Sequence, residues 1–76
     1  MDSSIFCTRV KERRISLGLT GYKFAEMLDM NPSNMYRLEH GMFPRDERKL
    51  VAIADVLGVS LDYLFGRTDN PTPLGK

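Results

Sequence analysis

The side chains best suited to polar chemistry gather in one short stretch, residues 31–40. Its hydroxyl, amide, phenol and guanidinium groups form hydrogen bonds, but it holds no pair of carboxylates that could act as acid and base. The chain has one histidine, His40, and one cysteine, Cys7, so a metal cluster or a histidine relay would lack partners. We interpret Cys7 as a core or surface thiol and His40 as a helix-end residue favoured by the helix dipole. The sequence therefore predicts recognition through hydrogen bonds, without a metal, a cofactor or an enzyme activity.

Length and composition predict a single globular domain. The chain has 76 residues, of which 42% are hydrophobic and 28% are charged, and its formal net charge is +1. The single cysteine excludes an internal disulfide, and no run of about 18 apolar residues is present to cross a membrane. Residues 1–4 lack a basic region followed by an apolar stretch, so they do not resemble a secretory signal. We therefore expect a cytoplasmic protein that makes no contact with membranes.

The elements that must position residues 31–40 are predicted to be short helices. Apolar residues recur at helical spacing throughout, and no segment alternates as a half-buried strand does. The third of five helices is expected to run from about Pro32 to His40, because proline lacks the amide that would be unpaired at a first helical position. The predicted N-caps of the second to fifth helices are Thr20, Asn31, Asp46 and Ser60. The residues expected to face the core are Phe6, Val10, Leu17, Phe24, Ala25, Leu28, Met35, Leu38, Leu50, Ile53, Ala54 and Leu57.

Charge and composition vary along the chain. Residues 9–14 carry four basic side chains and one acidic one, a local balance of +3, whereas residues 50–66 hold two aspartates and no Lys or Arg. Such charge runs can orient a molecule in an electric field, although solvated helix faces often carry them as well. Residues 67–76 include two prolines and show no apolar period. We therefore predict a domain over residues 1–66 and a flexible C-terminal tail over residues 67–76.

The second and third predicted helices form a helix-turn-helix, because only about three residues separate them. A longer pattern combines residues 10–14, 17–20, 24–28, 31–35, 37–41 and 53–66 in this order. Through these stretches, residues 6–66 of the chain resemble the Cro/C1-type (XRE-like) DNA-binding family. This resemblance implies an all-α, compact five-helix bundle of the lambda-repressor-like type, with helices 2 and 3 as the helix-turn-helix. It also implies a structural ion pair between Arg14 and Glu39, the alternative being a DNA contact for Arg14.

Three positions depart from the family pattern. Gly21 stands where the family usually has Gln, which removes one expected hydrogen-bond donor. Asp29 stands where a turn glycine is common, and an Asp adopts the left-handed conformation at a cost of about 1 kcal/mol. Glu47 replaces a commonly apolar residue early in the fourth helix and is expected to loosen the packing there.

The third helix is expected to read bases in the major groove of B-DNA, which is about 12 Å wide and admits one α-helix. Arg37 can donate two hydrogen bonds to guanine O6 and N7, the most discriminating single contact available. Asn34 reads adenine or holds the backbone, and Tyr36 meets a thymine methyl group or a phosphate; the sequence leaves both alternatives open. The residues predicted to contact bases are Pro32, Ser33, Asn34, Tyr36 and Arg37.

Other residues are predicted to hold the DNA backbone or a second copy of the chain. Free amides at the start of the second helix attract an anion, and the loop after Gly41 is expected to grip the other strand. One such module binds weakly, so we expect a homodimer on two half-sites about one helical turn apart. The predicted phosphate contacts are Thr20, Gly21, Tyr22, Lys23, Met42, Phe43 and Arg45. The predicted dimer contacts are Val59, Leu61, Tyr63, Leu64 and Phe65, with a core role for Tyr63 and Leu64 left open.

Two classes of function follow from these expectations. The first is a sequence-specific transcriptional regulator that binds double-stranded DNA, most simply a repressor on a palindromic operator. The alternative is an antitoxin or another protein-interaction module, in which the tail after Gly66 contacts a protein partner.

Overall fold

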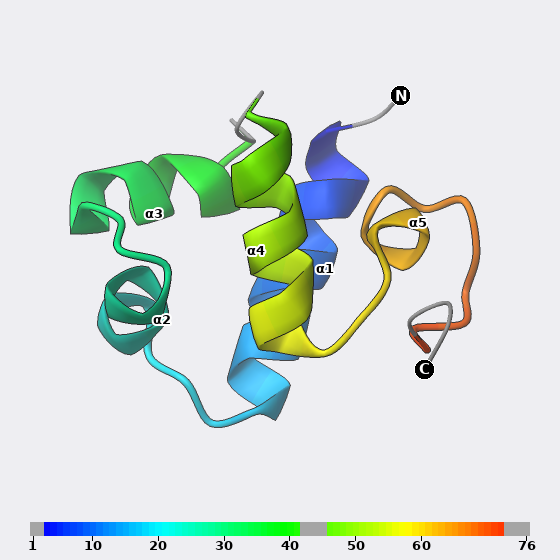
Figure 1. The fold of residues 1–76 in the computed structure, drawn as a ribbon, viewed down its shortest axis with the longest axis horizontal. Coiled ribbons are helices and arrows are strands. Elements are labelled where there is room, and N and C mark those ends of the chain that lie inside the picture. Colours follow the sequence, from blue (N-terminus) through cyan, green and yellow to red (C-terminus); the bar gives the residue numbers. More distant parts are fainter. Residues whose placement is uncertain (1–2, 42–45, 73–76) are drawn as a thin grey trace.

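The computed structural model describes residues 3–41 and 46–72, and these residues contain five helices and no strand. The helices are α1 (Ser3–Ser16), α2 (Gly21–Met27), α3 (Pro32–Glu39), α4 (Glu47–Leu57) and α5 (Leu61–Leu64). Figure 1 shows α4 lying in front of α1, with α2 and α3 on one side and α5 on the other. Because α1 packs against α3, α4 and α5, it is the central helix of the fold. The predicted all-α class is confirmed.

Side-chain caps begin four of the helices at the predicted residues. Asn31 Oδ1 accepts a hydrogen bond from the Ser33 amide at 2.8 Å, and Pro32 follows as the first helical residue of α3. The same kind of bond satisfies an amide that would otherwise be unpaired in the first turn of each helix. The other three caps are Thr20 to the Lys23 amide, Asp46 to the Arg48 amide and Ser60 to the Tyr63 amide.

Among the described residues, positive φ angles occur at Asp29 and at four glycines, and two of these positions show how turns of the fold are built. Asp29, between α2 and α3, has φ 55°, so it adopts the left-handed conformation that its position predicts. Gly66, after α5, has φ 80°, and a Cβ at this position would lie 2.9 Å from Cγ2 of Ile5. A glycine is therefore needed here both for its conformation and for the close approach of α1.

The core lies between α1, α3, α4 and α5, with α2 contributing Phe24 and Ala25. The rings of Phe6 and Phe65 pack with their centroids 4.9 Å apart, which joins α1 to the end of α5. Leu17 is 42% exposed, so its prediction as a core residue is wrong. The helical spacing does not apply to it, because α1 ends at Ser16 and Leu17 lies in the following turn. The largest fully buried side chains are Phe6, Val10, Phe24, Leu38, Ile53, Leu57 and Leu64.

The predicted dimer contacts do not form one exposed surface. Val59 and Leu64 are 3% and 0% exposed and belong to the core of the same chain. For Leu64 this is the core role that the sequence left open, whereas the prediction of Val59 as a partner contact does not fit its burial. The physical reason is that α5, which contains Leu64, packs against α1 and α4, and Val59 joins the same core cluster just after the end of α4. Leu61, Tyr63 and Phe65 are partly buried and pack against that core.

The segment after α5 is held against the domain as far as Pro71, which differs from the predicted boundary at Gly66. The Arg67 amide donates to Asp62 O at 2.9 Å, and the Ser60 amide donates to Pro71 O at 3.0 Å. Figure 1 shows this segment passing around the outer side of α5. Its hydrogen bonds use acceptors that a sequence pattern does not reveal, because they are backbone carbonyls. The remainder of the predicted tail, residues 73–76, lies outside the described residues.

The arginines of α1 hold the ends of other helices. Arg13 Nε donates to Leu57 O at 2.9 Å, and Arg9 Nη1 donates to Tyr63 O, so each guanidinium meets a carbonyl near a helix C-terminus. Arg9 also lies over the Tyr63 ring and bonds to Thr68 O. A cation at a helix C-terminus is favourable because the unpaired carbonyls carry partial negative charge. Much of the positive charge of residues 9–14 is therefore used inside the domain.

No helix within residues 3–41 and 46–72 combines the length and the apolar character that crossing a membrane would require.

Candidate nucleic-acid interface

The outer face of α3 carries the five residues predicted to contact bases, and all five are exposed. On the inner face, Met35 and Leu38 are 3% and 1% exposed. Because successive residues of a helix are about 100° apart, Ser33 and Arg37 point away from this buried pair. Tyr36 lies beside Ser33 and Arg37 on the exposed face, and Pro32 and Asn34 lie at the two edges of that face. The structure thus brings the predicted base-contacting residues together on one surface.

An ion pair fixes α3 to α1. Arg14 Nε lies 2.7 Å from Glu39 Oε2, and Arg14 Nη2 lies 3.0 Å from Glu39 Oε1. A third nitrogen of the same guanidinium donates to Leu19 O at 2.7 Å, in the connection between α1 and α2. The two side chains are only 12% and 9% exposed. All of these bonds are internal, so Arg14 positions α3 and does not face a ligand.

The start of α2 lies beside this surface and contains four of the predicted phosphate contacts. Tyr22 is 71% exposed, whereas Thr20 uses its hydroxyl oxygen to cap the Lys23 amide. Lys23 Nζ lies 3.2 Å from Glu26 Oε1, so a phosphate would have to compete with this exposed carboxylate. Gly21 leaves open space, because a Cβ there would meet nothing within 4 Å. The predicted contacts Met42, Phe43 and Arg45 lie outside the described residues.

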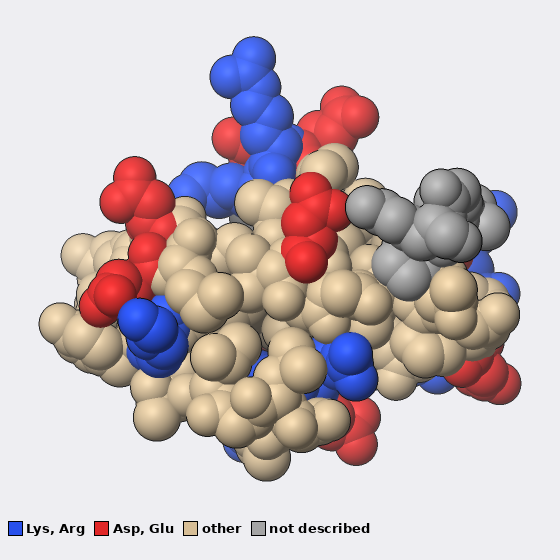
Figure 2. Space-filling view, turned by 60° about the horizontal axis from the view of Figure 1, so that its bottom comes forward, with Lys and Arg blue, Asp and Glu red and all other residues tan. Residues whose placement is uncertain are grey.

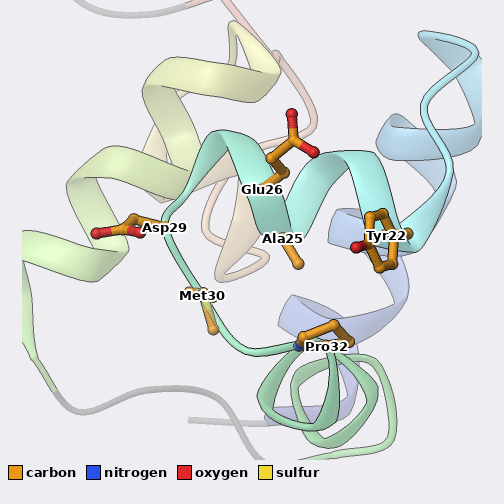
Figure 3. A pocket seen from close by; sticks show the side chains of 6 residues that line it. All are labelled: Tyr22, Ala25, Glu26, Asp29, Met30 and Pro32. Atoms are coloured by element: carbon orange, nitrogen blue, oxygen red, sulfur yellow. The ribbon is translucent and has the colours of Figure 1, made fainter.

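Two hollows mark this side of the molecule. The first, of about 220 Å³, joins the start of α2 to the outer face of α3, and its lining includes Gly21, Tyr22, Tyr36 and His40. The second, of about 250 Å³, lies between α2 and the start of α3, and Figure 3 shows Glu26 and Asp29 on its rim. Two carboxylates there disfavour a phosphate. The second hollow is therefore an edge of the candidate interface.

Charge is distributed sparsely on the face drawn in Figure 2. Basic and acidic side chains alternate around a broad uncharged area, and the described residues form no continuous basic patch on that face. The net charge of +1 gives little overall attraction for a polyanion, so the positions of individual charges matter more. Hydrogen bonds from side chains and helix-start amides must therefore supply much of any recognition of DNA.

Sequence reasoning missed a contact between two rings on α3. The rings of Tyr36 and His40 are stacked, with centroids 3.9 Å apart and planes 17° apart. His40 is the C-cap of α3, as its interpretation as a helix-end residue implies. Their separation by four residues was the available signal, because side chains at that spacing share a helix face.

The remaining candidate groups have structural surroundings. Cys7 is 3% exposed, and burial raises the pKa of its thiol above the ordinary value of 9.0. A raised pKa disfavours the thiolate, which is the reactive form. Among residues 3–41 and 46–72, no group of three or more His, Cys, Asp or Glu side chains is placed to hold a metal ion.

Comparison with known proteins identifies a family and a relative. A family model described as helix-turn-helix matches residues 10–64. A protein of Bacillus subtilis (strain 168), described as the uncharacterized HTH-type transcriptional regulator YobD, is 35% identical over 71 residues. This alignment covers 91% of the present chain and 62% of the relative, so the chain spans about three fifths of the relative's length.

Proposed function

This chain belongs to the XRE-type helix-turn-helix family, and on that premise we propose that it is a transcriptional regulator that binds double-stranded DNA with α3 in the major groove. The observation that carries the proposal is the division of α3 into two faces. Met35 and Leu38 anchor the helix in the core, while polar side chains that suit base edges occupy its exposed face. Such a helix enters a groove without unfolding any part of the domain.

Each exposed residue of α3 has a specific chemical role in this proposal. Arg37 forms no ion pair with any described residue, so its guanidinium is available to guanine O6 and N7. Ser33 donates or accepts one hydrogen bond, and Asn34 meets adenine or the backbone at the edge of the face. Pro32 and the Tyr36 ring offer apolar surface to a thymine methyl group.

The amides at the start of α2 are proposed to bind a phosphate on one side of the groove. The first-turn amides of a helix have no partner within the helix, and Thr20 satisfies only that of Lys23. The amides of Gly21 and Tyr22 are therefore suited to an anion, and the missing side chain at Gly21 lets the backbone approach closely. Lys23 adds a positive charge there once it leaves Glu26.

We further propose that two copies bind a palindromic operator and repress transcription by blocking access of the polymerase. A single small module makes few contacts, and two modules on half-sites one helical turn apart combine their affinities. The exposed parts of Leu61, Tyr63 and Phe65 are the surface proposed for the second copy, since Val59 and Leu64 are buried in the core.

Selection from a pool of random double-stranded oligonucleotides tests this function. We expect enrichment of sequences with two symmetric half-sites, and the affinity for a selected sequence should fall as salt is raised. Equal affinity for selected and random DNA would rule out sequence specificity. An affinity that does not change with salt would rule out binding to the DNA backbone.

A further inference from the structure

We infer that His40 is a positioning residue for DNA reading, because it holds the Tyr36 ring in one orientation on the outer face of α3. The inference rests on the proposed function and deepens it, since it identifies a residue that sets the specificity of a neighbouring base contact. His40 itself is not required to touch a base.

Two contacts fix the imidazole of His40 against Tyr36. The ring centroids are 3.9 Å apart with the planes at 17°, which is a stacked arrangement. In addition, His40 Nδ1 lies 2.7 Å from Tyr36 O. A carbonyl oxygen only accepts hydrogen bonds, so Nδ1 is the donor and carries the proton. The hydrogen bond therefore sets the position of the imidazole, and the stack transmits that position to the phenol ring.

Tyr36 needs such support because its own surroundings restrict it little. The residue is 65% exposed, and an exposed side chain exchanges among staggered rotamers. Fixing a rotamer during binding reduces affinity through lost conformational entropy. A ring that is already stacked loses less freedom on binding and presents one edge to a base pair. His40 thus improves both the affinity and the discrimination that Tyr36 provides.

The support itself is firm, because the end of α3 is anchored. The His40 amide donates to Arg37 O at 3.1 Å, and the preceding residue, Glu39, is held by Arg14. Both stacked rings line the hollow of about 220 Å³ that reaches the start of α2. The ring pair therefore shares this hollow with Gly21 and Tyr22, whose amides are proposed to bind a phosphate, so a displaced ring would affect the fit to DNA.

A double-mutant cycle tests this inference. Four proteins are compared by selection from random DNA and by titration of the selected sequence: the unaltered chain, His40→Ala, Tyr36→Ala and the double variant. We expect His40→Ala to weaken binding roughly two- to tenfold and to relax preference at the same base pair as Tyr36→Ala. In the Tyr36→Ala background, His40→Ala should change neither quantity, because the group that it positions is absent.

Further variants separate positioning from general stability. His40→Phe keeps a ring that can stack on Tyr36 but loses the Nδ1 hydrogen bond, so it should restore the preference only in part. Val51→Ala, on the exposed side of α4, should leave the preference unchanged. The inference is overturned if His40→Ala keeps the full preference, if the two substitutions act additively, or if His40→Phe behaves like His40→Ala. It is also overturned, while the proposed function stands, if Tyr36→Ala leaves the selected sequence unchanged. If the unaltered chain selects no sequence at all, both the function and the inference fail.

Discussion

Arg37 differs from the arginines of α1 because its guanidinium forms no ion pair with a described residue. Arg9, Arg13 and Arg14 donate to carbonyls or carboxylates inside the domain, and these bonds join α1 to the ends of other helices. Arg37 projects from α3 on the side opposite the core. The number of arginines in a segment therefore says little about DNA binding, whereas the partners of each guanidinium separate structural from recognition roles.

Replacing Arg37 tests its proposed role in reading a base. Arg37→Ala should weaken binding to the selected sequence by about 1–3 kcal/mol and relax preference at one base pair. Arg37→Lys should keep the positive charge but lose the bidentate pair, so its preference should relax as well. Competitive titration with single-base variants of the selected sequence measures both effects. As a control, Lys23→Ala should weaken binding to all DNA sequences alike. If Arg37→Ala kept the full base preference, the proposal that Arg37 reads a base would be wrong.

Burial of Cys7 predicts a dependence of stability on alkaline pH. Burial raises the pKa of this thiol, so the folded chain retains its proton where the unfolded chain loses it. The free energy of unfolding should therefore fall as pH rises above the ordinary pKa of 9.0. Urea unfolding of the unaltered chain and of Cys7→Ala across this range isolates the effect. The decline should be shallower in Cys7→Ala, and equal slopes would contradict the assignment to Cys7.

At the scale of elements, the orientation of α3 depends on contacts outside α3. Asn31 and Pro32 fix where the helix begins, but a cap does not decide which way a helix points. The Arg14–Glu39 pair and the buried side chains of Met35 and Leu38 set that direction relative to α1. Because the pair is largely removed from water, loss of one partner leaves a charge without compensation.

Replacing one partner of this pair should therefore be costly. Glu39→Gln removes the negative charge beside Arg14, and we expect a loss of about 3–5 kcal/mol in the free energy of unfolding. Urea denaturation measures the loss. The exposed pair between Lys23 and Glu26 is the matched control, and Glu26→Gln should cost no more than about 0.5 kcal/mol. Similar losses in the free energy of unfolding for the two variants would show that the buried ion pair stabilises the domain no more than the exposed one.

At the scale of the whole molecule, α1 connects the N-terminal part of the domain to α5 and to residues 68 and 69. Arg9 bonds to α5 and to residues 68 and 69, so it links the N-terminal helix to the segment after α5. The contact with Asp69 contributes little, because that carboxylate is 98% exposed. The bonds to carbonyls and the Ser60 amide bond to Pro71 O hold the segment more effectively.

Shortening the chain tests whether this segment stabilises the domain. Removal of residues 67–76 leaves the Ser60 amide without its acceptor and Arg9 with fewer partners. We expect a loss of about 1–2 kcal/mol, measured as a lower thermal midpoint. Removal of residues 73–76 alone, which keeps these bonds, should have little effect. Equal stability of residues 1–66 and the full chain would support the predicted domain boundary at Gly66 and contradict a stabilising role for residues 67–72.

The sequence determined the local features of this protein. Caps, helix spacing and positive-φ positions depend on neighbouring residues, so Thr20, Asn31, Asp46 and Ser60 predicted where four helices begin. The alternation of polar and apolar residues in α3 likewise predicted which side chains would be exposed. These features follow from the geometry of a single helix and need no knowledge of its neighbours.

Only the tertiary structure decided which groups meet over long distances in the chain. Val59 and Leu64 have the same apolar character whether they serve a core or a partner, and only the packing of α5 and its approach against α1 and α4 places them in the core. The roles of Arg9 and Arg13 depend on backbone carbonyls that every residue type carries, so no pattern of side chains identifies their partners. Folding brings those carbonyls and guanidinium groups together, and that proximity determines which charges stabilise the domain and which remain free for a ligand.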